Sequence, residues 1–453
     1  MIQLGLFSKI PESMAPLRKH SFPAASRFSM GAFREGCACM ESEAMMNGSE
    51  CQEDMAHFEK PQGAGLQRRI QRHVAGRVHR FLAVAPPQLA ALCKMELRQM
   101  GLSNLELTEA GVEFQGKLRD AYAANLWLRT AGRVVCRLGS FRGGTQGELF
   151  HKTAILPWEL WLNPEIPLKL SVLVERSRVS HEGLVRDSVV DAIQKRFKGL
   201  NFPFPRAGAC VENEWQQRLW VHLRTNHCLL SLDTTGPHLH ERGYRLLHSG
   251  APLRETLAAA ILLQCGWSGD IPLVDGMCGA GTFAIEGALI ARRKLPGLGR
   301  EFLFERWPSF QMKTWNHLQR KGKAGERPAA DSSLFALDLD AGAIAAAGQN
   351  AQRAGVGECI HFENMDFFQF DPARVPLKPG LLVLNPPYGK RLEMERGELY
   401  RDIGVHMRRV FRGWRFGIVV PHRKALSQLS LPASKVWSLP HGGLKVSVVL
   451  GRV

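Results

Sequence analysis

The chain has 453 residues, of which 45% are apolar, so it is long enough for two or three domains with sizeable cores. No apolar run reaches the ~20 residues that span a bilayer, which argues against a membrane protein. The net charge of +17 favours a polyanionic partner, and nucleic acid is the obvious one.

The first 75 residues are rich in Met, Ser, Gly and Glu and show little periodicity, so we expect residues 1–75 to form a poorly ordered extension. Cys37, Cys39, Cys51 and His57 do not have the spacing of a metal site, since C-x-C is not the usual pair and no second pair follows. We expect free thiols and no metal. The ten scattered cysteines do not resemble a disulfide framework, which indicates a reducing, cytoplasmic location.

Residues 76–146 predict a small α+β module. Alternating or apolar runs predict strands at 79–84, 111–114 and 133–138. Helical spacing over 88–97 and 118–128 places one helix between each pair of strands. This order is similar to a β-α-β-β unit.

Residues 147–245 predict a second α+β module, with a strand at 168–174, an amphipathic helix at 184–197 and a hairpin at 219–233. Its helix and the preceding loop are basic. For any single side chain a solvated helix face is the simpler interpretation. As a set in a basic protein, they are predicted to contact RNA phosphates. The candidates are Arg178, His181, Arg186, Lys195 and Arg196.

We place the next boundary near Gly250 and assign 246–453 to a doubly wound α/β domain. Its opening unit is a strand at 271–275, a small-residue loop through Thr282 and a helix at 283–290. The loop is neither G-x-G-x-x-G nor a P-loop. The acid at the strand end, Asp275, would repel phosphate and suits an amine. The basic stretch 291–332 is too long for a plain connection, so we expect a functional insertion or a mobile lid.

Three further polar residues follow predicted strands of this domain: Asp338, Asp366 and Asn385. An acid at the position of Asp338 usually grips a ribose diol, with Asp340 as a competitor that also has a helix-capping role. Asp366 is placed to accept from an adenine amine, or alternatively forms a turn. With Asp275, these residues end four successive strands and fit a nucleoside with an amino-acid tail.

The strand at 381–384 ends in Asn385-Pro386-Pro387-Tyr388, and its prolines force a rigid corner. The Asn385 side-chain oxygen and the Pro386 carbonyl are two acceptors, and Tyr388 is a ring beside them. Together they suit a planar group that carries an NH2. The alternative is a strand-ending turn whose Asn caps the next element.

The strings D-G-M-C-G-A-G-T, A-L-D-L-D, M-D-F-F and N-P-P-Y-G resemble motifs of class I S-adenosylmethionine-dependent methyltransferases that act on exocyclic amines. Upstream, G-V-E-F-Q-G, A-N-L-W-L-R-T, S-R-V-S-H-E-G, R-G-Y-R and A-P-L-R-E-T-L-A-A-A resemble a ferredoxin-like segment followed by a THUMP RNA-binding domain. From about residue 78 to the end, the chain is similar to bacterial 23S rRNA guanine-N2-methyltransferases. It departs from them at Gly276, usually Pro, and at Ala280, usually Ser. The chain ends at Val453, so we expect no second, fused methyltransferase.

The resemblance implies S-adenosyl-L-methionine as cofactor and 23S rRNA or a ribosomal precursor as partner, with tRNA as the alternative. Asn385 and Pro386 would accept from guanine N2 while Tyr388 stacks on the flipped base. Asp275 and the loop would hold the methionine part, Asp338 the ribose and Asp366 the adenine. The loop residues in this prediction are Cys278, Gly279, Gly281 and Thr282.

Competing functions are adenine-N6 methylation, methylation of a protein glutamine, and a non-catalytic role in ribosome assembly. The basic upstream half argues against the glutamine reaction. The sequence gives neither the modified nucleotide nor the oligomeric state.

Overall fold

A computed structural model describes residues 64–206, 215–245, 253–328, 333–374, 377–387, 399–421, 423–441 and 444–453. Tyr388 lies outside these ranges, and so do Cys37, Cys39, Cys51 and His57, for which the sequence predicts no metal site. In the part of the chain that is described, no helix is both long and apolar enough to cross a bilayer. The same residues contain no group of three or more His, Cys, Asp or Glu side chains arranged to hold a metal ion.

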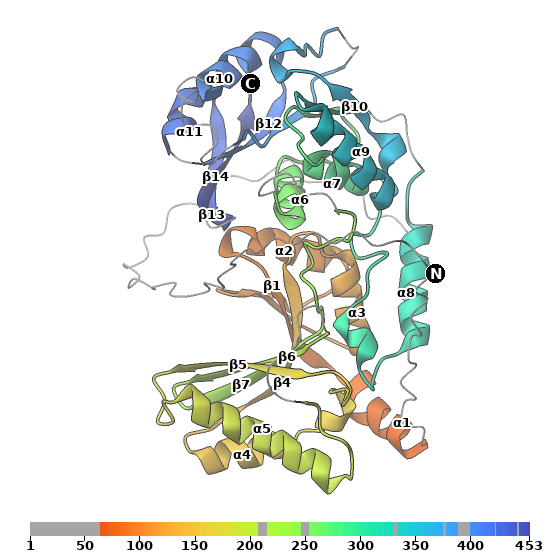
Figure 1. The fold of residues 1–453 in the computed structure, drawn as a ribbon, viewed down its shortest axis with the longest axis vertical. Helices are drawn as coiled ribbons and strands as arrows, with labels where there is room; N and C mark the ends of the chain where they lie inside the picture. Colours follow the sequence, from red (N-terminus) through yellow and green to blue (C-terminus); the bar gives the residue numbers. More distant parts are fainter. Residues whose placement is uncertain are drawn as a thin grey trace, which may run out of the picture. The chain divides into compact units, whose positions relative to one another are not determined.

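The first half of the described chain forms one seven-stranded sheet in the order β2-β3-β1-β4-β7-β6-β5 (Figure 1). Its strands are β1 (His79–Val84), β2 (Glu106–Thr108), β3 (Gly111–Gly116), β4 (Arg133–Arg142), β5 (Leu168–Glu175), β6 (Gln217–Arg224) and β7 (His227–Asp233). The helices are α1 (Ala64–Ile70), the π-helix η1 (Gln71–Ala75), α2 (Pro87–Gln99), α3 (Leu118–Trp127), α4 (Gln146–Ala154), the short η2 (Trp158–Leu160) and α5 (Glu182–Gly199).

The two modules expected from the sequence share this sheet, because β4 of the first pairs with β7 of the second along most of its length. The boundary expected at residue 147 therefore runs through one continuous sheet. Order also begins earlier than expected, since residues 64–75 are helical and bury Ile70 and Val74. The predicted extension therefore does not reach residue 75.

The second half forms a seven-stranded sheet in the order β10-β9-β8-β11-β12-β14-β13. Its strands are β8 (Leu273–Asp275), β9 (Leu334–Asp338), β10 (His361–Asn364), β11 (Leu381–Leu384), β12 (Arg415–Val420), β13 (Ala433–His441) and β14 (Leu444–Arg452). The helices are α6 (Glu255–Gln264), α7 (Thr282–Ala291), η3 (Leu303–Arg306), α8 (Met312–Ala324), α9 (Ala341–Ala354), η4 (Gly357–Cys359), η5 (Phe367–Gln369), α10 (Leu399–Val410) and α11 (Arg423–Leu429).

Helices cover both faces of this second sheet, which confirms the predicted doubly wound domain. The core on one face contains Ile261 of α6, Ala288 of α7 and Ala347 of α9. The core on the other face contains Met407 of α10 and Ala425 of α11. In sheet order, β10, β9, β8, β11 and β12 are parallel to one another. β14 pairs antiparallel with β12, and β13 pairs antiparallel with β14.

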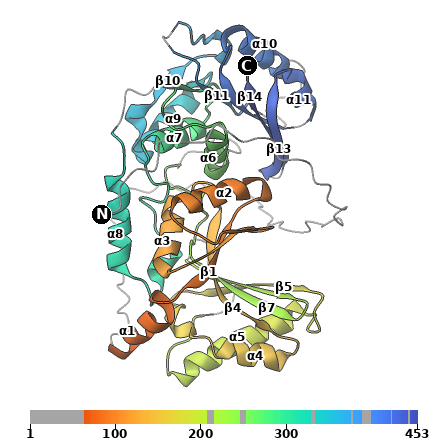
Figure 2. The same cartoon turned by 180° about the vertical axis from the view of Figure 1, so that it is seen from behind.

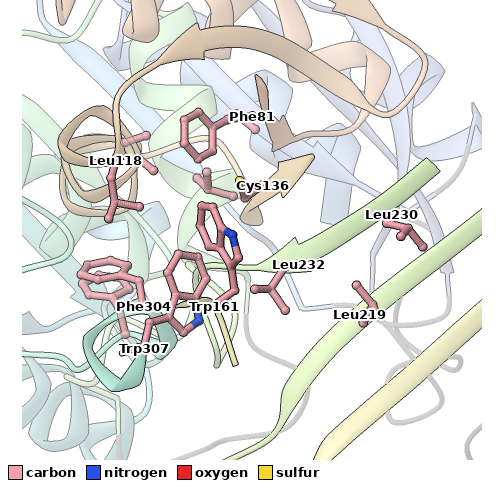
Figure 3. Close-up of a cluster of buried hydrophobic side chains, with 14 of the residues drawn as sticks. Phe81, Leu118, Cys136, Trp161, Leu219, Leu230, Leu232, Phe304 and Trp307 are labelled. Atoms are coloured by element: carbon pink, nitrogen blue, oxygen red, sulfur yellow. The ribbon is translucent and has the colours of Figure 1, made fainter. Parts of the chain in front are cut away.

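The described part of the stretch between α7 and β9 packs into a core and does not have the character of a mobile lid. Its aromatic side chains join the core of the first sheet, where Phe304 stacks on Tyr122 at 4.2 Å between ring centroids. Trp307 packs edge-on against Trp161 at 5.3 Å, and Figure 3 shows both in that core with Phe81 and Cys136. Phe304 and Trp307 are at most 1% exposed. The insertion therefore anchors the second half of the chain to the first.

Candidate functional site

The four predicted residues lie at one edge of the second sheet. Because β10, β9, β8 and β11 are neighbours and parallel, their carboxyl ends face the same way. Asp275 and Asp338 are the last residues of β8 and β9, and Asn385 directly follows β11. Asp366 comes two residues after β10. The series expected from the sequence is therefore contiguous in the fold.

Asp275 is fully buried, and only one of its carboxylate oxygens is satisfied. Oδ2 accepts from the backbone N–H of Ala284 at 3.2 Å, whereas Oδ1 has no hydrogen-bond partner among the described residues. Burial, reinforced by the nearby Asp338 carboxylate, raises the pKa of Asp275 to about 8. A buried acceptor without a donor is costly, so this position fits the ammonium or another donor of a ligand.

The loop after β8 exposes its backbone where the chain turns. Gly279 has φ +52° and open space where a Cβ would lie, so a flat ligand can approach its main chain. Gly281 has φ +80°, and a Cβ there would lie 2.9 Å from the Cβ of Ala347. Cys278 is buried and its N–H donates to Leu337. The loop is thus held against β9 and α9 while Gly279 remains open.

The departure at Gly276 has a steric reason. A Cβ there would lie 2.6 Å from the Phe367 ring and 2.7 Å from a Leu384 methyl group. A side chain does not fit at this position without moving its neighbours. The departure at Ala280 leaves the loop supported, because Asn350 donates its Nδ2 to the Ala280 carbonyl at 3.2 Å.

Asp338 holds the loop and its own turn in place. Its Oδ2 accepts from the Gly279 N–H at 2.8 Å, and its Oδ1 accepts from the Asp340 N–H at 3.0 Å. The competing Asp340 caps α9 by accepting from Gly342 at 2.7 Å. Asp338 is thus tied to the loop, and its role toward a ribose stays a prediction. Asp340 has the helix-capping role that the sequence predicts for it.

Asp366 caps the short helix η5, where its Oδ1 accepts from the Phe368 N–H at 3.0 Å. This is the turn-forming role that the sequence left open as the alternative. The side chain remains partly exposed at the sheet edge. Its role toward adenine stays a prediction.

The corner after β11 carries an unpaired acceptor. All four residues of β11 are buried, and so is Pro386. Among the described residues, the Oδ1 atom of Asn385 is buried and accepts no hydrogen bond. The residues directly after Pro387, which would carry the backbone donor of an Asn cap, lie outside the described ranges. Both the cap and a ligand contact therefore stay predictions for Asn385.

Sequence reasoning missed a buried charged network beside the loop. The Oγ1 of Thr282, the first residue of α7, accepts from Arg245 at 2.7 Å. Arg245 also donates to the Leu253 carbonyl at 2.9 Å and lies 3.3 Å from Glu255. Burial raises the pKa of Glu255 to about 7, against the opposing charge of Arg245. The R-G-Y-R string was the available signal for this network.

The same network continues to the first half of the chain. Arg242 lies 3.4 Å from the fully buried Glu286 of α7 and donates to the Arg129 carbonyl at 2.8 Å. Arg129 in turn donates to Leu289 at the other end of α7, at 3.2 Å. The helix behind the loop is therefore fixed to residues of both halves.

The predicted RNA contacts do not form one uniform group. Arg178, His181, Arg186 and Lys195 are exposed in or before α5, and Lys195 Nζ lies 5.2 Å from the Phe150 ring centroid. Arg196 differs from the other four candidates, because its guanidinium has a buried partner. Arg196 donates to both carboxylate oxygens of the buried Glu159, at 2.9 and 3.0 Å, and Arg69 pairs with the same carboxylate. Its guanidinium is engaged in holding the fold.

Comparison with known protein families covers both halves of the chain. Residues 242–443 match the RMKL-like methyltransferase domain, and residues 80–135 match the RlmL ferredoxin-like domain. A putative RNA methyltransferase of Synechocystis is 32% identical over 376 residues, which are 82% of this chain and 95% of that protein. A ribosomal RNA large subunit methyltransferase K/L of Psychromonas ingrahamii is 34% identical over 79% of this chain. The chain spans 48% of that relative.

Solved structures agree with these relatives. A putative methyltransferase complexed with SAH has a TM-score of 0.72 and 28% identity, over 83% of this chain and 99% of that one. A predicted N6-adenine-specific DNA methylase from Listeria monocytogenes has a TM-score of 0.71 and 29% identity, over 86% and 98%. The open loop and the unpaired acceptors at the sheet edge fit a donor-bearing cofactor. The chain belongs to the RMKL-like family of S-adenosyl-L-methionine-dependent methyltransferases and carries the RlmL ferredoxin-like domain.

Proposed function

We propose that the protein methylates the exocyclic N2 amine of a guanine in 23S rRNA or its precursor. The observation that carries this proposal is the buried, unpaired Oδ1 of Asn385 at the end of β11. A buried acceptor without a partner is destabilising unless a ligand supplies the donor. An exocyclic NH2 group of a base that has been flipped out of its stack is such a donor.

In this proposal, the corner orients the nucleophile. The N2 amine is weakly nucleophilic because its lone pair is delocalised into the ring. Asn385 Oδ1 and the Pro386 carbonyl accept its two hydrogens, so the nitrogen faces the methyl donor in line, and Tyr388 stacks on the base. When bound, the cofactor supplies an activated methyl group. No general base is assigned: orientation and exclusion of water favour the transfer, and the proton that N2 loses on methylation is released to solvent when the product leaves.

The proposed cofactor contacts divide among the other strand ends. Asp275 and the backbone from Gly279 to Gly281 hold the methionine part, with Cys278 and Thr282 completing the loop. Asp338 holds the ribose, and Asp366 accepts from the adenine amine. The open backbone at Gly279 and the unfilled Oδ1 of Asp275 support this division.

The proposal that the substrate is RNA rests on the net charge of the chain and on the names of its relatives. The net charge of +17 suits a phosphate backbone, and several relatives are named as ribosomal RNA large subunit methyltransferases. In this proposal, residues 147–245 act as a THUMP-like RNA-binding module in the cytoplasm. A tRNA guanine is the nearest alternative.

Adenine-N6 methylation is the second candidate, because the neighbour from Listeria monocytogenes is described as a predicted N6-adenine-specific DNA methylase. A corner with two acceptors can accept the hydrogens of guanine N2 or of adenine N6 equally well. A non-catalytic assembly factor is a third candidate. The unfilled acceptors at Asp275 and Asn385 argue against it, because a factor that binds neither a cofactor nor a flipped base has no donor for them.

The test is Asn385→Ala, with Asn316→Ala as a matched control that removes the same amide from the exposed face of α8. We expect Asn385→Ala to abolish methyl transfer to 23S rRNA while calorimetry still detects S-adenosylmethionine binding. The control should retain both. Loss of cofactor binding in Asn385→Ala would refute the assignment of this residue to the base.

A further inference from the structure

One face of the first sheet presents a basic, aromatic strand. Helices α4 and α5 lie against the opposite face (Figures 1 and 2), where Val185 and Ile193 share a core with Leu219. Along β6 the burial alternates, so every second side chain points away from that core. These outward residues are Arg218, Trp220, His222 and Arg224, and all are partly or fully exposed.

The pairing register extends this pattern across the sheet. Arg80 of β1 lies opposite Arg137 of β4, which lies opposite Ser231 of β7. Ser231 in turn lies opposite Trp220 of β6, which lies opposite Ser171 of β5. A single row across five strands thus carries two guanidinium groups, two hydroxyl groups and an indole, and both guanidinium groups pair with Glu113 of β3.

This face forms one wall of a groove. A cavity of about 740 Å³ is lined by Arg133, Arg137 and Trp220 on the sheet side. Its other wall comes from the methyltransferase half, through Arg254 and Thr256 at the start of α6 and Leu439 of β13. The volume is within the range of ligand sites, which is about 300–1,000 Å³. A strand of RNA held here would touch both halves of the protein.

The groove contains planar groups that are already arranged for stacking. The Arg133 guanidinium lies 5.7 Å from the Trp220 ring centroid. His238 and His240, which also line the groove, are stacked with their centroids 5.2 Å apart and their planes inclined by 22°. Aromatic and guanidinium faces bind unstacked bases without needing a particular sequence.

The cations of the groove are of two kinds. Arg133 is paired with Asp233, and Arg137 is paired with Glu113 at 3.0 Å. Arg254 lines the groove, whereas Arg218 lies beside it on the same face of β6 as Trp220. Among the described residues, neither forms an ion pair, so their charges are available to phosphates. Arg133 and Arg137 therefore hold the groove in place, whereas Arg218 and Arg254 supply unpaired positive charge.

We propose that this face and its groove bind an unpaired segment of the substrate RNA, with a base on Trp220 and phosphates at Arg218 and Arg254. This inference rests on RNA being the substrate. Single-stranded RNA fits better than a duplex, because the bases of a duplex are stacked on each other and offer no free face to Trp220. The surface differs from the α5 surface that the sequence favoured.

The first experiment uses Trp220→Ala and Trp220→Phe with a short fluorescein-labelled oligoadenylate and fluorescence anisotropy. We expect about tenfold weaker binding for Trp220→Ala, as is typical of one lost base stack. Trp220→Phe keeps a ring and should bind within about threefold of wild type. An unchanged affinity for Trp220→Ala would overturn the proposal, and so would an equal loss for the Phe variant, since that would indicate damage to the sheet.

The second experiment compares two surfaces by charge. Arg218→Ala with Arg254→Ala should weaken oligoadenylate binding and reduce the slope of log affinity against log salt by about 1.4. The matched control, Arg98→Ala with Arg353→Ala, removes the same charge from exposed positions on α2 and α9 and should leave the slope unchanged. If the control pair carries the loss, the groove is not the RNA site.

The two proposals can fail separately. Trp220-dependent oligoadenylate binding without methyl transfer to rRNA would support the groove and refute the proposed reaction. If the protein methylates rRNA but Trp220→Ala binds oligoadenylate as tightly as wild type, the proposed reaction is supported and the groove is refuted as the RNA site. Calorimetry with S-adenosylmethionine on each variant shows that the catalytic half is still folded.

Discussion

Asp275→Asn should make the ligand-free protein more stable at alkaline pH. Burial raises the pKa of Asp275 from 3.8 to about 8. Because the folded pKa lies above the unfolded one, the stability contributed by this carboxyl is complete below about pH 4 and falls as pH rises. It is lost above about pH 8, where the folded state must also ionise a buried group.

The size of this effect follows from the two pKa values. At about 1.36 kcal/mol per pH unit, the interval from 3.8 to about 8 corresponds to an upper limit of about 6 kcal/mol. Asparagine has nearly the same shape and does not ionise. It can keep the bond from Ala284 and place its amide at the oxygen that is unpaired in the wild type.

The assay is urea denaturation of wild type and Asp275→Asn at about pH 5 and about pH 9, followed by circular dichroism. Between these conditions the wild-type midpoint should fall further than that of the variant. Asp191→Asn, an exposed change on α5, is the control and should follow the wild type. Equal pH dependence in wild type and Asp275→Asn would refute the reasoning. The variant should also bind S-adenosylmethionine more weakly, because the ligand ammonium loses its counter-charge.

Three other variants test the packing around the site. Trp307→Ala should lower the unfolding free energy by about 3–5 kcal/mol in urea titrations, because it empties a buried position in the core of the first sheet. Gly281→Val should abolish cofactor binding in calorimetry, since φ is +80° and the Cβ would lie 2.9 Å from Ala347. Arg196→Ala should lower the melting temperature but leave RNA affinity nearly unchanged, because this side chain is paired with Glu159. A large loss of RNA affinity would restore it as a phosphate contact.

The strand-end series could be predicted because its signals are local. Asp275, Asp338 and Asn385 each directly follow a short apolar run, and parallel strands bring their carboxyl ends to one edge. The periodicity of the chain therefore sufficed to group Asp275, Asp338 and Asn385. Asp366 was predicted at the right edge, but whether it contacts a ligand or only caps η5 depends on a hydrogen bond that composition does not reveal.

The shared first sheet could not be predicted in the same way. Its joining pair, β4 with β7, connects residues about ninety positions apart, and local periodicity does not specify such partners. The stretch between α7 and β9 was expected to be a functional insertion or a mobile lid because of its length, and length does not distinguish a lid from a packed segment. Its aromatic residues, including Phe304 and Trp307, were the better signal, since such a density of large apolar side chains in a polar stretch requires a core to bury them.

The central claim is that a guanine amine is methylated at the Asn385 corner. The most direct measurement is incubation of the full chain with isotope-labelled S-adenosylmethionine and unmodified 23S rRNA, followed by mass spectrometry of the released nucleosides. We predict label in N2-methylguanosine, and none when Asn385→Ala replaces the wild type. Label in N6-methyladenosine, or label that appears only when tRNA replaces rRNA, would contradict the account.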